Sequence, residues 1–344
     1  MTAAATTARP ARVPSPRLTR WLLRLHRPAL YVWIALVVVL SAALLWLRGP
    51  VTDTAAEAWR HYDACNGDGP RTCAVDQSPI SRYKELYGYT TTAVFLMPFL
   101  AAAWAGASLI GRELESRTAQ LAWTQGVSPA RWLAAKLAVP AVPLAAGSAL
   151  LVLLHHLAWS AGEGRIDTAK TWYDTTTFAV NGPALVALTL AAPAVGALAA
   201  LVLRNALAAL AAALVGMAAL WTAALGALPH LWPSVTRTSA LADGPLGVGI
   251  EVRHGLVTST GAHVPAPGCP NDNYRACYRS SDAVGFYKDY HPRSHFWPLH
   301  LMESGLVLAV AALLALAAFR LLARRTGTAR TVRRTGTARE GRAV

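Results

Sequence analysis

The sequence predicts an all-α integral membrane protein with six transmembrane helices, on the strength of three observations. Apolar residues make up 54% of the 344 residues and charged residues only 15%, against roughly 25% charged in an average soluble domain. The apolar residues are gathered into long runs, and a run of about 20 residues is long enough to cross about 30 Å of hydrocarbon as a helix. Basic residues collect in alternate connecting segments, as they do in multi-span membrane proteins.

Six apolar runs are the predicted spans: residues 29–47, 90–111, 137–159, 183–203, 206–228 and 298–322. Only Arg204 and Asn205 separate the fourth span from the fifth. These two spans must form a tight hairpin, because one merged helix would be about twice as long as the bilayer is thick. An even number of spans places both termini on one side. The segments predicted for the other side are residues 48–89, 160–182 and 229–297, and the last is long enough to form a small cap.

The distribution of charge orients the protein. The segments on the side of the termini hold 19 basic and 3 acidic residues, whereas the segments on the other side hold 13 basic and 14 acidic residues. Cytoplasmic loops carry the excess of arginine and lysine, so both termini are predicted to be cytoplasmic and the cap extracellular. Topology thus explains the net charge of +14, and no nucleic-acid partner is needed. A composition rich in alanine and arginine indicates a bacterial protein, located in the plasma membrane.

Both ends of the chain are predicted to lie against the membrane. Residues 1–28 read as a basic tail followed by an amphipathic interfacial helix. Its two faces are Leu18, Trp21, Leu22 and Leu25 on one side and Arg17, Arg20, Arg24 and Arg27 on the other. A plain basic anchor is the alternative. Residues 323–344 repeat Arg-Arg-Thr-Gly-Thr-Ala-Arg and are predicted to form a basic cytoplasmic tail attracted to anionic membrane lipid.

All four cysteines fall in the predicted outer segments, two in each of two segments. The pairs are Cys65 with Cys73 and Cys269 with Cys277, each eight positions apart. An oxidising exterior permits disulfides, and a local bridge would contribute about 2–3 kcal/mol in the chain-entropy model. Bridges between the two segments are the alternative. The spacing differs from the short Cys-x-x-Cys of zinc sites, so neither a metal nor a cofactor is expected.

Glu303 is the acidic residue inside a predicted span. A carboxyl group two helical turns into the membrane costs a few kcal/mol unless it is protonated, paired or facing water. Two interpretations stay open for it: Glu303 lines a substrate path, or it makes a structural hydrogen bond between helices.

The segment between the second and third spans is predicted to hold a short amphipathic helix over residues 113–125. Glu113 and Arg117 are an i, i+4 pair on its polar face, while Leu114 and Leu121 lie on the other face. Gly126 ends the helix. Ser128 followed by Pro129 is typical of the start of the next helix.

The residues of this segment resemble the cytoplasmic segment of type-2 ABC-transporter permease subunits, particularly actinobacterial ones. They read Glu113-x-Glu115-x-Arg117-Thr118, then Leu-Ala-Trp-Thr-Gln, and later Arg131-Trp132 and Lys136. In that family a Glu-x-Glu-x-Gly-Thr pattern ends in a short coupling helix, so Arg117 stands where glycine is usual. The resemblance implies a subunit that forms a homodimer or heterodimer and docks a separate ABC ATPase subunit. The docking residues that it implies are Glu113, Glu115, Arg117, Thr118, Arg131 and Lys136.

The chain itself lacks the phosphate-binding motif of ATPases. That motif requires glycine before lysine, and the four lysines follow Tyr83, Ala135, Ala169 and Tyr287. The chain is therefore predicted not to be an enzyme, and the resemblance implies that it is the permease subunit of an ABC exporter. The alternative is a non-transporting membrane sensor or anchor that recruits a cytoplasmic partner. An intramembrane enzyme is disfavoured, because the predicted spans offer Glu303 and a few histidines near their ends but no catalytic constellation.

Overall fold

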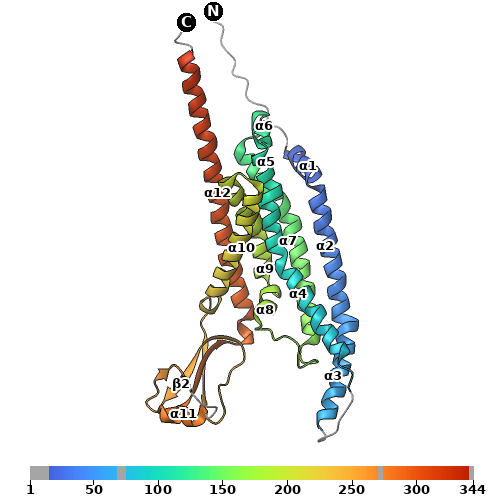
Figure 1. Ribbon diagram of the computed structural model, residues 1–344, viewed down its shortest axis with the longest axis vertical. Helices are drawn as coiled ribbons and strands as arrows, with labels where there is room; N and C mark the ends of the chain where they lie inside the picture. The colour runs from blue at the N-terminus through green and yellow to red at the C-terminus, as the bar shows by residue number, and fades with distance from the viewer. Residues whose placement is uncertain (1–14, 68–74, 270–273, 341–344) are drawn as a thin grey trace, which may run out of the picture.

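The computed structural model describes residues 15–67, 75–269 and 274–340. The protein is a long bundle of helices that carries a small β-sheet at one end (Figure 1). Within the described residues, six helical stretches are long and apolar enough to cross a membrane: Arg27–Cys65, Ser78–Glu115, Pro129–Gly162, Pro183–Leu203, Ala206–His230 and Arg293–Gly327. Each contains most or all of one predicted span, so the prediction of six spans is confirmed.

The first two spanning helices are longer than predicted. The first comprises α2 (Arg27–Trp46), a π-helical turn η1 (Leu47–Val51) and α3 (Thr52–Gly67), and it follows the short helix α1 (Ser15–Leu25). The second comprises α4 (Ser78–Trp104) and the π-helical η2 (Ala105–Gly111). The predicted loop 48–89 is therefore largely helical. Because α3 and α4 pack against each other, through Ala55, Ala56 and Tyr83 of one buried cluster, these polar stretches stay helical beyond the apolar runs.

The fourth and fifth spans agree with the prediction. Helix α9 (Pro183–Leu203) and helix α10 (Ala206–Ala227) are joined by the predicted two-residue connection. Arg204 ends α9 in the left-handed region at φ 56°, and the Asn205 side chain accepts a hydrogen bond from the Ala208 nitrogen at 2.9 Å. This pair of residues is thus a helix stop followed directly by a helix cap.

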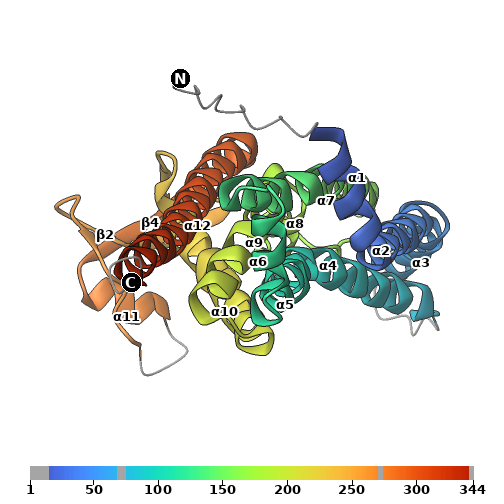
Figure 2. The ribbon, with the colours of Figure 1, turned by 90° about the horizontal axis from the view of Figure 1, so that it is seen from above.

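Helix α9 forms the centre of the bundle. It packs against α4, α10 and two longer helices, α7 (Pro129–Gly162) and α12 (Phe296–Glu340). Figure 2 shows α9 between α2 and α3 on one side and α12 with the sheet on the other. The contact with η2 is close, since a β-carbon at Gly196 would come within 2.6 Å of the Gly106 nitrogen. Helix α12 also runs on past residue 322, so much of the predicted C-terminal tail is helical.

The prediction of an all-α protein is wrong for residues 229–297. This segment forms a four-stranded antiparallel sheet of order β1-β4-β2-β3, and we call it the cap. Its elements are β1 (Val235–Ala240), β2 (Ile250–Thr258), β3 (His263–Val264), α11 (Tyr274–Ser280) and β4 (Ala283–His291). A search for long apolar runs cannot detect such strands, because they are only two to nine residues long.

The predicted disulfide between Cys269 and Cys277 is present, with the two Cα atoms 6.0 Å apart. It closes the loop between β3 and the helix α11 within the cap. The other predicted pair cannot be placed in the same way, since Cys73 lies outside the described residues.

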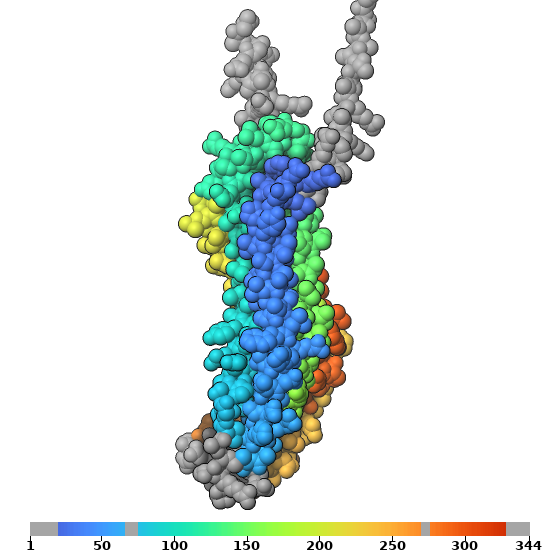
Figure 3. All heavy atoms as spheres, turned by 90° about the vertical axis from the view of Figure 1, so that its right-hand side faces the viewer, coloured from blue at the N-terminus to red at the C-terminus, as the bar shows by residue number. Residues whose placement is uncertain are grey.

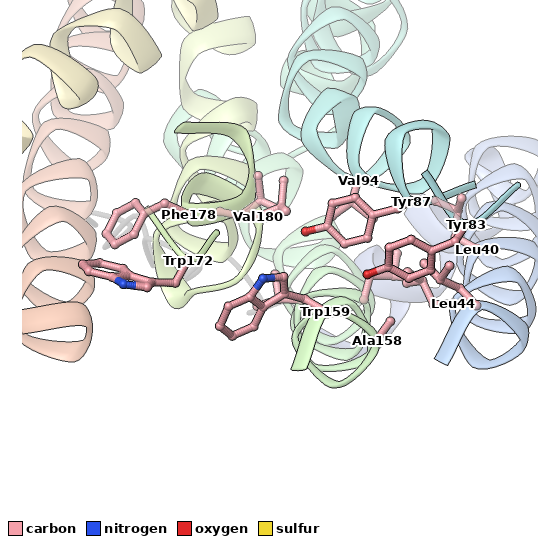
Figure 4. Packing of buried hydrophobic residues seen from close by; sticks show 14 of the residues in the cluster. Leu40, Leu44, Tyr83, Tyr87, Val94, Ala158, Trp159, Trp172, Phe178 and Val180 are labelled. Atoms are coloured by element: carbon pink, nitrogen blue, oxygen red, sulfur yellow. The ribbon is translucent and has the colours of Figure 1, made fainter. Parts of the chain in front are cut away.

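Near the cap end of the bundle the core is rich in aromatic side chains. Tyr83 and Tyr87 of α4 are stacked with ring centroids 6.0 Å apart. Figure 4 shows them beside Trp159 of α7, with Trp172 and Phe178 packed toward α12. This cluster joins helices that precede the cap, including the short α8 (Thr175–Val180), to the start of α12.

Candidate functional site

The segment between the second and third spanning helices lies at the end of the bundle opposite the cap (Figure 1). We call residues 112–128 the connector. It contains α5 (Arg112–Glu115) and α6 (Thr118–Thr124), which meet at Arg117. Arg117 has φ 59°, in the left-handed region, which costs a non-glycine residue about 1–2 kcal/mol. The single helix predicted over residues 113–125 is therefore wrong, because this residue breaks it into two.

The end of the connector agrees with the sequence. Gly126 has φ 92° and follows the last turn of α6. The Ser128 hydroxyl then accepts a hydrogen bond from the Arg131 nitrogen at 3.3 Å, which caps α7. Pro129 occupies the first turn, where its missing N–H costs nothing.

The carboxylate of Glu113 turns inward to α7. Its two oxygens accept hydrogen bonds from Lys136 Nζ at 2.5 Å and from Trp132 Nε1 at 3.1 Å. The Lys136 side chain is fully buried, and the Glu113 side chain is 15% exposed. The predicted pairing of Glu113 with Arg117 is wrong, because Glu113 pairs with Lys136 while Arg117 is exposed at the break between α5 and α6.

A histidine that the sequence reasoning missed completes this contact. His26, at the joint between α1 and α2, has Nε2 3.1 Å from Lys136 Nζ. Burial, followed by the charge of Lys136, lowers the pKa of His26 from 6.5 to about 4, although Glu113 acts in the opposite direction. His26 is therefore neutral at physiological pH, and its Nε2 accepts a hydrogen bond from the Lys136 ammonium group. Because its partner is 110 positions away, no local pattern pointed to it.

We call His26, Glu113, Trp132 and Lys136 the junction. It joins three separate parts of the chain: the α1–α2 joint, the connector and the start of α7. A buried ion pair with further hydrogen bonds is costly to break, since the remaining charge is left without a partner. The junction therefore ties these parts together.

Glu115 makes a second attachment. Its carboxylate accepts hydrogen bonds from the Ala206 nitrogen at 3.1 Å and from the Asn205 side chain at 3.3 Å. Ala206 is the first residue of α10, where backbone N–H groups lack partners within the helix and the helix dipole favours negative charge. Glu115 thus attaches the connector to α10.

One side of α6 remains exposed after these attachments. We call it the docking face, and it consists of Arg117, Gln120, Leu121 and Thr124, all exposed and spaced as neighbours on one helical side. Leu121 is 61% exposed. The prediction that Leu114 and Leu121 lie on the same face is wrong, since Leu114 packs against the core whereas Leu121 is exposed. Ala119 takes the inward position of α6 and is buried.

The residues predicted to dock a partner therefore fall into different groups. Glu113 and Lys136 contact each other inside the bundle, and Glu115 contacts α10. Arg117 and Thr118 are exposed, while Arg131 is half-buried at the start of α7. The structure thus brings Glu113 and Lys136 together and places Glu115 against α10, and of the predicted residues only Arg117 belongs to the docking face.

A second group of polar side chains lies near the cap end. His155 of α7 is fully buried, with Nε2 2.8 Å from the Thr91 hydroxyl and Nδ1 2.6 Å from the Asn181 side-chain oxygen. Both ring nitrogens thus have partners. These contacts join α4, α7 and the residue that follows α8.

Glu303 of α12 lies in the same half of the bundle but lacks such partners. Its Oε2 is buried without a hydrogen-bond partner among the described residues, and the nearest ring nitrogen, His300 Nδ1, is 4.0 Å away. His300 is stacked on Phe178 with ring centroids 4.0 Å apart. In the described part of the chain, no group of three or more potential metal ligands is present.

Comparison with known proteins assigns the helical part of the chain to a family. A family model described as "ABC-2 membrane transporter related" matches residues 34–228. The match covers more than half of the chain, from the first spanning helix to the end of the fifth, and it includes the whole connector. No curated protein and no solved structure matches the chain significantly.

Proposed function

We propose that this chain, which belongs to the ABC-2 membrane transporter related family and is a multi-pass membrane permease, is the permease subunit of an exporter. It would couple ATP hydrolysis by a separate ATPase subunit to movement of a substrate across the bacterial plasma membrane. Membrane domains of this family generally pair with such an ATPase subunit. The observation that carries the proposal is the family match across the spans and the connector between them.

The docking face is the surface that we assign to the ATPase. An exposed leucine flanked by polar side chains on one helical face suits the groove of a partner protein, because a short helix binds there through an apolar anchor. Leu121 supplies the anchor, and Arg117 supplies a positive charge beside it. Of the docking residues implied by the resemblance, this assignment keeps only those that face outward.

The attachments of the connector explain how a movement of the ATPase would reach the spans. Displacement of α6 would be transmitted through the Glu113–Lys136 pair to α7 and, by way of His26, to the joint between α1 and α2. Glu115 would transmit it to α10. Small shifts at a docking site move whole packed helices, because such interfaces have discrete arrangements.

The orientation follows from charge. The excess of basic residues on the side of the termini favours a cytoplasmic position for α1, the connector and the tail of α12. These parts lie at one end of the bundle in Figure 1, and the cap lies at the other. The permease would act as a pair, either with a second copy or with a related chain, around a substrate path that includes Glu303.

Reconstitution tests the proposal. The permease is placed in lipid nanodiscs with soluble ATPases encoded in the same genome, and binding and ATP hydrolysis are measured. We expect one ATPase to bind and to hydrolyse ATP faster with the permease present. Leu121→Asp and Arg117→Glu should reduce this stimulation at least about tenfold, the effect of losing an interface anchor.

The matched control is Arg320→Glu, which changes an exposed arginine of α12 near the same end of the bundle. It should retain most of the stimulation. If both docking-face variants behave as the wild type does, the docking face is wrongly assigned. If no ATPase binds the wild-type permease, the sensor or anchor function is favoured instead.

A further inference from the structure

An apolar groove lies on the side of the bundle, between α2, α4 and α7, in the half that carries the connector. Its volume is about 400 Å³, which is within the size range of small-molecule sites. In Figure 3 this side faces the viewer, with α2 in blue between α4 in cyan and α7 in green. The groove is lined by apolar side chains, among them Leu23, Leu30, Val32, Leu100, Val139 and Pro140.

The groove opens where hydrocarbon would surround the protein. Val32 and Leu100 line it and are 69% and 55% exposed. An apolar space of this kind does not hold water, so the available occupant in a bilayer is an acyl chain. From Lys136 to Leu144 the lining of α7 extends about 12 Å along the helix, enough for a substantial part of such a chain.

Positive charge lies at one end of the groove. Arg20 lies one helical turn before Leu23, and Arg27 directly follows His26; Leu23 and His26 both line the groove at this end. Both are exposed, and in the described part of the chain neither forms an ion pair with an acid. Lys136 also borders the groove, but its charge is offset by Glu113. The uncompensated charge is therefore at the rim rather than in the lining.

We propose that this groove binds an anionic phospholipid from the leaflet on the connector side. One acyl chain fills the groove, and the phosphate lies between Arg20 and Arg27. The charge complementarity selects an anionic lipid over a zwitterionic one, since basic residues near a membrane surface attract anionic headgroups. The bound lipid would contact α1, α2 and α7 beside the junction. The proposal does not depend on an ATPase partner.

Photocrosslinking tests it. The full-length permease is reconstituted in phosphatidylcholine nanodiscs that contain a small fraction of phosphatidylglycerol with a diazirine on its acyl chain. The comparison probe is phosphatidylcholine with the same diazirine-bearing chain. We expect phosphatidylglycerol to label peptides covering residues 29–36 and 139–144 several-fold more than phosphatidylcholine does. The double variant Arg20→Gln, Arg27→Gln should lose this preference, so that the two probes label these peptides equally.

Two matched controls accompany this variant. Arg320→Gln removes an exposed arginine from α12 near the same end and should keep the preference. Ala29→Phe fills the groove and should reduce labelling by both probes, whereas Ala211→Phe on the exposed side of α10 should not. If Ala29→Phe fails to fold, the arginine variants still decide the question, because their side chains lie at the surface.

Equal labelling by the two probes would overturn the proposal. Labelling of α10 by phosphatidylglycerol as strong as that of residues 29–36 and 139–144 would also overturn it. Loss of labelling when an uncharged apolar compound is added, with no effect of the arginine variants, would show that the groove binds apolar solutes instead. A permease that binds no ATPase but keeps the lipid preference would contradict the proposed function and leave this inference standing.

Discussion

The carboxylates of Glu113 and Glu303, at opposite ends of the bundle, have different surroundings. At the connector end, Glu113 has a lysine and a tryptophan as hydrogen-bond donors within 3.1 Å. Toward the cap end, the buried Oε2 of Glu303 has no partner among the described residues, and His300 is 4.0 Å away. Glu113 is thus part of a hydrogen-bond network, whereas Glu303 lies near the ring of His300, which is stacked on Phe178.

This contrast indicates different tasks for the two ends. Paired charges hold together parts that belong to separate segments, and breaking them is costly. The cap end is held instead by aromatic packing, as Figure 4 shows, which does not require a charged Glu303. A buried acid that the fold does not need is a candidate for function.

The largest effect is expected from Lys136→Met. This variant leaves the Glu113 carboxylate mostly buried without its cation, which should lower the free energy of unfolding by about 3 kcal/mol. Denaturant unfolding of the purified protein in detergent measures it. Lys170→Met is the matched control, since Lys170 forms an exposed pair with Asp174 at 3.2 Å and should contribute less than about 1 kcal/mol. Equal losses in the two variants would contradict the role of the junction.

The next effect is a dependence on pH at the connector end. The pKa of His26 is about 4 in the folded protein and 6.5 ordinarily, so the unfolded chain binds more protons between these values. The contribution of His26 to stability is therefore complete above pH 6.5 and is lost as pH falls toward 4. Because His26 is only partly buried, we expect a loss of about 1 kcal/mol between pH 6.5 and 5.

Unfolding curves recorded from pH 7.5 to 5 measure this dependence. His26→Gln keeps a hydrogen-bond acceptor but does not titrate, so its stability should fall less with pH than that of the wild type. His61→Gln, at an exposed position of α3, should follow the wild type. Parallel curves for the wild type and His26→Gln would contradict the prediction.

A smaller effect, of opposite sign to that of Lys136→Met, is expected from Glu303→Gln. No hydrogen bond to Oε2 is lost, and the cost of burying a carboxylate is removed, so stability should be unchanged or higher by about 1 kcal/mol. Glu113→Gln, its counterpart in the junction, should be less stable than the wild type. Thermal unfolding compares the two variants. Loss of transport by a stably folded Glu303→Gln variant that still stimulates the ATPase would place Glu303 on the substrate path.

The smallest effect is expected from Arg117→Gly. Glycine adopts the left-handed conformation without the steric penalty of a side chain. The stability of the folded connector should therefore increase by up to about 1 kcal/mol. Arg117→Ala also removes the arginine side chain, but alanine keeps the steric penalty of the left-handed conformation. This variant should therefore not stabilise the connector. Hydrogen exchange of the α6 amide groups compares the variants. Slower exchange in Arg117→Ala than in Arg117→Gly would show that the backbone conformation is not the cause.

The helix boundaries show what could be predicted locally. The hairpin at Arg204 and Asn205 was placed within one residue, because a helix stop and a cap act through neighbouring residues. Ser128 and Gly126 were identified for the same reason. The strands of the cap were missed, because they are short and their pairing joins residues far apart in the chain.

The extent to which each spanning helix is buried inside the protein could not be predicted from its composition. Helices α9 and α10 are both strongly apolar, yet 72% of an apolar stretch of 18 residues is buried in α9 and only 17% of such a stretch in α10. In lipid, an exposed leucine costs nothing, so hydrophobicity does not distinguish a central helix from a peripheral one.

The sequence by itself determined the number of crossings and the places where they reverse, because each crossing must satisfy its backbone hydrogen bonds within one apolar run of sufficient length. The tertiary structure alone decided which side chains meet. Glu113 contacts Lys136 rather than Arg117 because one left-handed residue turns α6 away from α5. His26 joins that contact from 110 positions away, where only the packing of helices could bring it.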